Sequence, residues 1–278
     1  MTAAHECCAT RYPILLLHGM GFHDRLPIHY YWGRIPHCLR RGGARVYFGD
    51  QDGNADIADN ARGLVPVIRR ILEETGAQKV NIIAHSKGGL EARFLAGSLG
   101  MAGCIASITT LSTPHNGSVT VDVLLRHFAP LIRFGCLFMD AGRRVLGDRH
   151  PATYRVITQL TTDYMRSFNA LHPVPEGIFC QSFAFVMEHW YRDLFMAFPY
   201  VVVRAFEGDN DGLLTPKNAE WVNFRGIYRS AGVLRGISHP DVTNYLLLPF
   251  SRKSGDHRIG DMAAFYVRIA GDLKARGL

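Results

Sequence analysis

The chain has 278 residues, of which 47% are hydrophobic and 20% are charged. This length fits one large α/β domain or at most two ordinary domains, and the composition excludes a disordered chain. Lys and Arg number 31 against 24 Asp and Glu, for a net charge of +7. The basic residues form no dense run and no aromatic–basic stripe, so we expect a solvated basic surface and no nucleic-acid partner.

Neither the N-terminal residues nor the cysteines of the chain indicate a special environment. The six cysteines lack CxxC spacing, so they predict neither a zinc site nor a disulfide scaffold. Residues 1–8 lack the basic and apolar regions of a secretory signal, and the apolar run 194–203 is shorter than the ~20 residues that span a bilayer. We therefore expect no transmembrane segment and a cytoplasmic protein, or a secreted one if a signal has been removed.

Short apolar runs alternate with longer amphipathic segments along the chain. The runs are almost continuously apolar, as in strands that are buried on both faces of a parallel sheet. We predict strands at residues 12–17, 45–49, 80–85, 105–111, 178–186 and 201–206. We predict helices at residues 31–41, 57–75, 87–99 and 261–276. This alternation favours a mostly parallel, doubly wound α/β sheet.

One segment, residues 119–154, interrupts the alternation with a helical pattern that no strand follows. Its apolar residues recur at i, i+3, i+4 and i+7, which is the spacing of one helix face. They are Leu124, Leu125, Phe128, Leu131 and Ile132. Taken alone, this pattern is typical of an ordinary core helix.

A serine follows the third predicted strand and begins a predicted helix. The stretch reads Ile83-Ala84-His85-Ser86-Lys87-Gly88-Gly89, which is the strand–turn–helix context of a nucleophile elbow. The tight turn requires small residues two positions before and after the serine, and Ala84 and Gly88 meet that requirement. The pattern is A-x-S-x-G, with alanine in place of the usual first glycine. We predict Ser86 as a nucleophile.

A serine hydroxyl needs a histidine to take its proton and a carboxylate to orient that histidine. In hydrolases with such an elbow, the acid and then the histidine follow the serine along the chain. Asp211 follows the predicted strand 201–206, and His239 lies downstream of it, before the last helix. His257 is a second candidate base, but its polar, glycine-containing surroundings predict a surface loop. We therefore favour Asp211 and His239.

The anionic intermediate of ester cleavage needs two backbone N–H donors. Lys87 supplies one because it directly follows the serine at the start of a helix. The turn Leu17-His18-Gly19-Met20-Gly21 follows the first predicted strand, and Met20 is the predicted second donor. Without the other motifs, His18-Gly19 would read equally well as a plain β-turn.

Together these motifs resemble the bacterial true lipases, which are the calcium-dependent triacylglycerol lipases of the Pseudomonas and Burkholderia type. The resemblance is dense over residues 12–118, patchy to about residue 190, and resumes from Asp211 to the end. It includes Lys79-Val-Asn-Ile-Ile-Ala-His-Ser, Thr113-Pro-His-Asn-Gly-Ser118 and Asn210-Asp-Gly-Leu.

The resemblance implies one α/β-hydrolase domain over residues 1–278, with Ser86, Asp211 and His239 as a catalytic triad. It also implies that residues 119–154 form a helical lid over an acyl pocket. A structural Ca²⁺ would be held by Asp241, in His239-Pro-Asp, and by Asp193, whose surroundings have diverged from the family. No organic cofactor is implied.

The expected activity is hydrolysis of carboxylic esters through an acyl-enzyme, on acylglycerol-like substrates and at a lipid–water interface. The same triad would also serve an acyltransferase, a thioesterase or a polyester depolymerase. A non-catalytic, hydrolase-like binding module is the alternative from another class. Three departures from the family, namely Ala84, the lid sequence and the missing export signal, leave the substrate and the location open.

Overall fold

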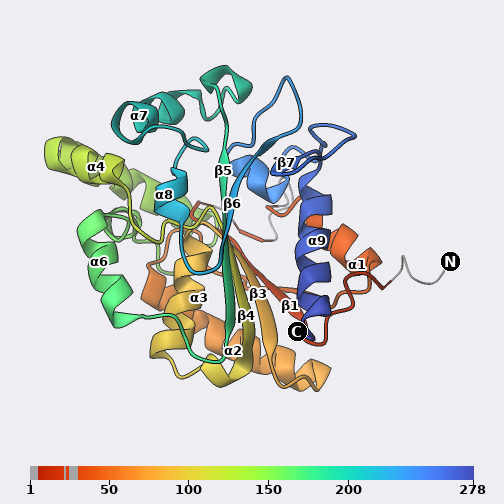
Figure 1. The fold of residues 1–278 in the computed structure, drawn as a ribbon. Coiled ribbons are helices and arrows are strands. Elements are labelled where there is room, and N and C mark those ends of the chain that lie inside the picture. Colours follow the sequence, from red (N-terminus) through yellow and green to blue (C-terminus); the bar gives the residue numbers. More distant parts are fainter. Residues whose placement is uncertain (1–5, 22, 25–30) are drawn as a thin grey trace.

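The computed structural model describes residues 6–21, 23–24 and 31–278 (Figure 1). Within these residues, seven strands form one sheet in the order β2-β1-β3-β4-β5-β6-β7, and all neighbours are parallel. The strands are β1 (Ile14–Leu17), β2 (Val46–Phe48), β3 (Val80–His85), β4 (Ile105–Leu111), β5 (Phe179–Val186), β6 (Phe224–Ser230) and β7 (Arg258–Ile259). The prediction of a mostly parallel sheet is confirmed. Most of the N-terminal segment considered above for an export signal lies outside the described residues.

Helices cover both faces of the sheet, as the strand–helix alternation predicts (Figure 1). One face carries α1 (Ile35–Arg41) and α9 (Met262–Ala275), and the other carries α2 (Ile57–Thr75) and α3 (Lys87–Ser98). Strand β1 is buried on both faces: Ile14 and Leu16 pack on the α1/α9 side, and Leu15 and Leu17 pack on the α2/α3 side. Each fully buried side chain of this kind stabilises the fold by about 1.5–3 kcal/mol.

The predicted strand 201–206 is wrong, because these residues belong to helix α7 (Ala197–Glu207). A run of three valines has high strand propensity, but α7 buries only Tyr200 and Val203 and exposes Phe206. Strands β6 and β7 were not predicted. β6 is only partly buried and contains two arginines, so it lacks the continuous apolar pattern of the central strands.

The remaining helices are shorter and connect these layers. They are α5 (Thr153–Thr158), α6 (Thr162–Leu171) and α8 (Pro216–Ala219), with 3₁₀ turns at Ala102–Cys104, Trp190–Arg192 and Pro240–Thr243. No helix among the described residues combines the length and the apolar character that spanning a bilayer requires.

Helix α4 (Val119–Val145) occupies most of the predicted lid segment, and α5 begins at its end. Ser118 caps α4, because its side chain accepts a hydrogen bond from the Val121 N–H. The helix is kinked at Phe128, two residues before Pro130, which has no N–H to donate. Figure 1 shows α4 and α7 together beyond the carboxyl ends of the strands, where parallel α/β sheets carry their ligand sites.

Candidate active site

Ser86 lies in a strained turn between β3 and α3. Its backbone angles are φ 53° and ψ −130°, a region that non-glycine residues rarely occupy. The surrounding packing explains why the turn needs small residues: a Cβ added to Gly88 would lie 2.6 Å from the His18 carbonyl oxygen. The Ser86 N–H donates to the Leu111 carbonyl at 3.0 Å, which ties the turn to the end of β4. The turn therefore holds Ser86 at the carboxyl end of the sheet.

Asp211 and His239 contact each other directly. His239 Nδ1 donates to Asp211 Oδ2 at 2.8 Å, and the His239 backbone N–H donates to the Asp211 carbonyl at 2.7 Å. Both residues are buried. The two residues are 28 positions apart in sequence, and the segment between them forms α8 and β6 before it returns the histidine to the acid. This is the contact that orients a catalytic imidazole.

Asp211 reaches this position by a route that differs from the predicted one. It does not follow a strand formed by residues 201–206, since that segment is helical. Instead the chain leaves the sheet after β5, forms α7, and returns, where the Met187 N–H donates to the Asn210 carbonyl at 2.9 Å. Asp211 therefore lies next to the end of β5.

Four hydrogen bonds hold the Asp211 carboxylate in its ionised form. Oδ1 accepts from the N–H groups of Leu213 (3.0 Å) and Leu214 (2.9 Å), and Oδ2 accepts from the Ser112 hydroxyl (2.7 Å) as well as from His239. Burial by itself would raise the pKa of Asp211, but His239 and these donors outweigh burial and hold the pKa below its ordinary value. Sequence reasoning missed Ser112, although it directly precedes the Thr113–Ser118 motif.

His239 also lies beside the nucleophile elbow. Its ring centroid is 4.5 Å from that of His85, the residue before Ser86. Within the described residues, the Ser86 hydroxyl donates no hydrogen bond, so the structure brings Asp211 and His239 together without closing the bond from serine to histidine. Such bonds are often long in unliganded sites and tighten when substrate binds.

The two predicted oxyanion donors flank Ser86. A Cβ added to Gly19 would lie 2.7 Å from the Ser86 Cβ, so the turn that carries Met20 packs directly on the serine. Within the described part of the chain, we find no protein acceptor for the backbone N–H of Met20 or Lys87. The Gly19 N–H donates to the Tyr31 hydroxyl at 2.8 Å, which anchors the turn. Sequence reasoning missed Tyr31.

The alternative base, His257, lies elsewhere. It is exposed, and its ring packs 4.9 Å from the Tyr228 ring, against Gly226 of β6. No carboxylate among the described residues orients it. The structure therefore gives His239, and not His257, the surroundings of a triad base.

The two predicted calcium ligands, Asp193 and Asp241, influence each other but do not form a complete cage. Burial raises the pKa of Asp241 to about 6; Arg235 opposes that effect, and the Asp193 carboxylate adds to it. Asp241 Oδ1 pairs with Arg235, whereas its buried Oδ2 has no partner among the described residues. No cluster of three or more described His, Cys, Asp or Glu side chains is arranged to hold a metal. Two carboxylates with one unpaired buried oxygen nevertheless fit a Ca²⁺ that takes further ligands from backbone carbonyls.

The predicted lid residues lie on the exposed helix α4. Phe128 and Leu131 are 52% and 69% exposed, and Leu124, Leu125 and Ile132 are partly buried. Other large apolar side chains on α4 and on the segment that contains α7 are also exposed: Phe134, Leu137, Phe138, Met139, Leu194, Phe195, Phe198 and Val201. This part of the surface is far more apolar than a solvated helix pair requires.

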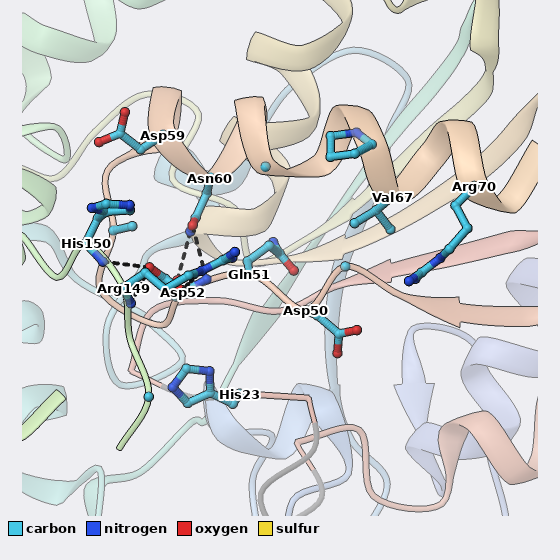
Figure 2. Close-up of a pocket in the computed structure, with 15 residues that line it drawn as sticks. His23, Asp50, Gln51, Asp52, Asp59, Asn60, Val67, Arg70, Arg149 and His150 are labelled. Atoms are coloured by element: carbon cyan, nitrogen blue, oxygen red, sulfur yellow. Dashed lines mark hydrogen bonds and ion pairs between the residues drawn. The ribbon is translucent and has the colours of Figure 1, made fainter. Parts of the chain in front are cut away.

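A polar pocket of about 680 Å³ lies along α2, beside the loop that follows β2 (Figure 2). Most of the residues that line it are polar, among them Asp52, Asn60 and His150. Neither Ser86, Asp211 nor His239 lines it. Its inner wall, however, includes Gln51, which lies close to the oxyanion turn.

Comparison with known proteins reveals relatives in sequence. No protein-family model matches the chain. A triacylglycerol lipase from Burkholderia plantarii is 40% identical over 124 residues, which are 43% of this chain and 34% of that protein. A triacylglycerol lipase from Pseudomonas fragi is 40% identical over 123 residues, covering 44% and 41% of the two chains. The matches thus span well under half the length of these relatives. Triacylglycerol lipase 2 of Saccharomyces cerevisiae is 28% identical over 260 residues, covering 89% and 74%.

Solved structures extend the likeness to the whole chain. The mature lipase BlEst2 of Bacillus licheniformis superposes with a TM-score of 0.64 at 23% identity, over 89% of this chain and 92% of that one. A metagenomic carboxyl esterase superposes with a TM-score of 0.70 at 17% identity, over 99% and 77%. The chain has the α/β-hydrolase fold. The resemblance to the bacterial lipases is confirmed by the relatives, and this hydrolase fold is confirmed by the structures.

Proposed function

We propose that this α/β-hydrolase-fold chain is a serine hydrolase that cleaves carboxylic esters through an acyl-enzyme. The observation that carries the proposal is the 2.8 Å contact between His239 Nδ1 and Asp211 Oδ2, beside a strained turn that presents Ser86. Relatives named triacylglycerol lipases support the same reaction class.

The proposed reaction has two balanced steps. In the first, His239 Nε2 takes the Ser86 proton, the serine oxygen bonds to the ester carbonyl carbon, and His239 returns the proton to the departing alcohol. In the second, His239 takes a proton from water, the water oxygen bonds to the acyl carbon, the bond from that carbon to the serine oxygen breaks, and His239 returns the proton to Ser86 as the carboxylic acid leaves. Asp211 holds the imidazole and stabilises its positive charge, and the N–H groups of Met20 and Lys87 receive the negative charge on the carbonyl oxygen.

The exposed apolar surface of α4 and α7 supports an acylglycerol-like substrate presented at a lipid–water interface. Leu124, Leu125, Phe128, Leu131 and Ile132 are the residues that we propose contact acyl chains or the interface. A lid over residues 119–154 would then expose or cover the site as α4 moves about its kink at Phe128.

We further propose that Asp193 and Asp241 hold a structural Ca²⁺. Asp241 directly follows His239-Pro240, so a bound cation would neutralise the two carboxylates and fix the loop that carries the base. The buried, unpartnered Asp241 Oδ2 supports this assignment. Arg235 now neutralises Asp241 from one side, and the cation would compete with it.

Acyl transfer, thioester cleavage, polyester cleavage and binding without catalysis are the alternatives. The chain should be incubated with p-nitrophenyl butyrate in water and with added glycerol or a thiol, and then treated with a fluorophosphonate. Ester hydrolysis with phosphonylation of Ser86 supports the proposal. Product formed mainly with glycerol would instead identify an acyltransferase, and neither turnover nor labelling would indicate a binding module.

A further inference from the structure

One of the two proposed oxyanion donors, Lys87, also forms a buried ion pair through its side chain. Lys87 Nζ is 2.6 Å from Glu91 Oε1, one helical turn along α3, and the two side chains are 2% and 0% exposed. Lys87 Nζ also donates to the Ala55 carbonyl at 2.8 Å. A buried ion pair contributes little net stability compared with an apolar pair, because desolvating both charges costs about as much as their attraction returns. The pair therefore needs an explanation other than stability.

Glu91 joins this pair to the neighbouring helix and loop. Its Oε1 accepts from Asn60 Nδ2 of α2 at 2.8 Å, and its Oε2 accepts from Gln51 Nε2. Asn60 in turn exchanges hydrogen bonds with the Asp52 backbone, at 2.8 and 3.1 Å. Figure 2 shows Gln51, Asp52 and Asn60 side by side at the inner wall of the polar pocket. The start of α3 is thus fixed to the loop that follows β2.

The same loop contacts the second oxyanion donor through His18. The buried His18 ring places Nε2 3.1 Å from the Gln51 carbonyl oxygen and Nδ1 2.7 Å from the Gly19 carbonyl oxygen. The Gly19 carbonyl belongs to the same peptide unit as the Met20 N–H. In a planar trans peptide these two groups point in opposite directions. Both partners are carbonyl oxygens, which only accept, so each bond requires a proton on the His18 nitrogen that makes it. With a proton on Nδ1, the hydrogen bond to the Gly19 carbonyl fixes the direction of the Met20 N–H.

We propose that Lys87 and Glu91, acting through Gln51 and His18, are positioning residues that set the two oxyanion donors relative to each other. The inference rests on the proposed function. Lys87 acts twice: its backbone N–H faces the developing charge, and its side chain anchors that backbone against Glu91. None of the four side chains needs to touch the substrate. Their effect is expected on the transition state, because the oxyanion forms only there.

Two variants test the role of the pair. Glu91→Gln keeps the shape of the side chain but removes its charge, and the double variant Lys87→Met/Glu91→Met removes both charges together. The double variant guards against a misfolded protein, because removing both partners of a buried pair leaves no unpaired charge. Loss of one oxyanion donor lowers kcat by about 10²–10³-fold, so a misdirected donor should lower it by about tenfold or more. KM should stay within about twofold, since ground-state binding does not use the donors.

An inhibitor that forms the oxyanion separates positioning from general stability. An alkyl trifluoromethyl ketone adds reversibly to the serine, and its Ki should rise about tenfold or more in both variants, in parallel with the loss of kcat/KM. Ser107→Ala is the matched control. Ser107 donates a buried hydrogen bond of 2.7 Å to Asn81 between β3 and β4, away from the site. This control should lower the melting temperature but leave kcat and Ki unchanged.

The outcomes are distinct. Melting temperatures lowered in both variants, with kcat and Ki within about twofold of the parent, would overturn the inference and leave the pair with a structural role only. A parent chain that neither turns over p-nitrophenyl butyrate nor reacts with the fluorophosphonate would overturn the proposed function, and the inference with it. Loss of kcat and of ketone affinity together in the folded double variant would support the positioning role.

Discussion

The Ser112 hydroxyl donates to the same Asp211 oxygen that accepts from His239, at 2.7 and 2.8 Å respectively. Ser112 thus stabilises the ionised acid and limits the rotation of its carboxylate. Ser112 directly follows the last residue of β4 and has a left-handed backbone conformation with φ 46°. The acid is therefore positioned by β4 as well as by its own loop.

We expect Ser112→Ala to lower kcat/KM by about tenfold, because the free energy of one hydrogen bond to a charged group corresponds to a factor of about that size. Removing this donor also raises the pKa of Asp211, since the bond favours the ionised form. Rates measured with a soluble ester at neutral pH test this expectation. A variant that keeps the kcat/KM of the parent would show that the hydroxyl does not act on the acid.

Ser86→Ala and His239→Ala should each lower kcat by roughly 10⁴-fold or more on a p-nitrophenyl ester, because triad residues act as a unit. His257→Ala is the control and should remain within a few-fold of the parent, as its ring packs on Tyr228 away from any described carboxylate. If His257→Ala proved the inactive variant, the assignment of the base and the calcium proposal at Asp241 would both be wrong.

Calcium should raise the melting temperature of the parent, since a ligand that binds only the folded state stabilises it by mass action. The effect should be larger at pH 8 than at pH 5, because the pKa of Asp241 is about 6 and protons compete for the carboxylate below it. Asp241→Asn should remove the effect. Arg235→Met should strengthen it by removing the competing guanidinium.

Asp163→Asn, at an exposed ion pair on α6, serves as a control for that experiment and should behave like the parent. Melting curves that coincide in chelator and in excess Ca²⁺, together with metal analysis that finds no bound calcium, would count against the site.

Glu207 joins the start of α4 to the end of α7. Its Oε1 accepts from the Ser118 hydroxyl and from both the N–H and the hydroxyl of Thr120, each at 2.7 Å, and its Oε2 accepts from Asn218. Burial would raise the pKa of Glu207, but these donors outweigh it and lower the pKa below its ordinary value. Its stabilising effect is therefore present above the unfolded-state pKa and is lost as the pH falls through the lower folded-state value.

We accordingly expect Glu207→Gln to lower the free energy of unfolding by about 1–3 kcal/mol at pH 7. The difference between parent and variant should shrink at the most acid pH values, where Glu207 becomes protonated in the parent as well. Thermal unfolding from pH 3 to 7 measures this. If the difference in unfolding free energy between parent and variant did not change with pH, the charge of Glu207 would not contribute to holding α4 and α7 together.

Phe128→Asp should impair hydrolysis of long-chain, emulsified esters far more than hydrolysis of soluble acetate or butyrate esters. Phe128 is 52% exposed, so the substitution removes an apolar surface residue without opening the core. Leu171→Asp is the matched control, at an equally apolar but distant position on α6 that is 73% exposed. Equal losses on all chain lengths would argue that α4 is a structural helix and not a lid.

The elbow could be predicted because it is local. A buried apolar strand, a serine flanked by small residues and a helix all lie within residues 80–98, and neighbours in sequence decide their geometry. Asp211 and His239 could be predicted by their order in the chain, and the structure brings them into contact. The route of the chain to Asp211 could not be predicted, because residues 201–206 have the composition of a strand but fold as part of helix α7, beyond the sheet.

The sequence by itself thus determined strands β1 to β5, the main helices on both faces of the sheet and the triad candidates, since buried strands and elbow turns leave short-range patterns. Only the tertiary structure decided that Ser112 donates a hydrogen bond to Asp211, and that Glu91, Gln51 and His18 lie in one buried network. These side chains come from four separate loops and helices. Which polar groups meet depends on how the helices pack on the sheet, and a pattern of neighbouring residues does not carry that information.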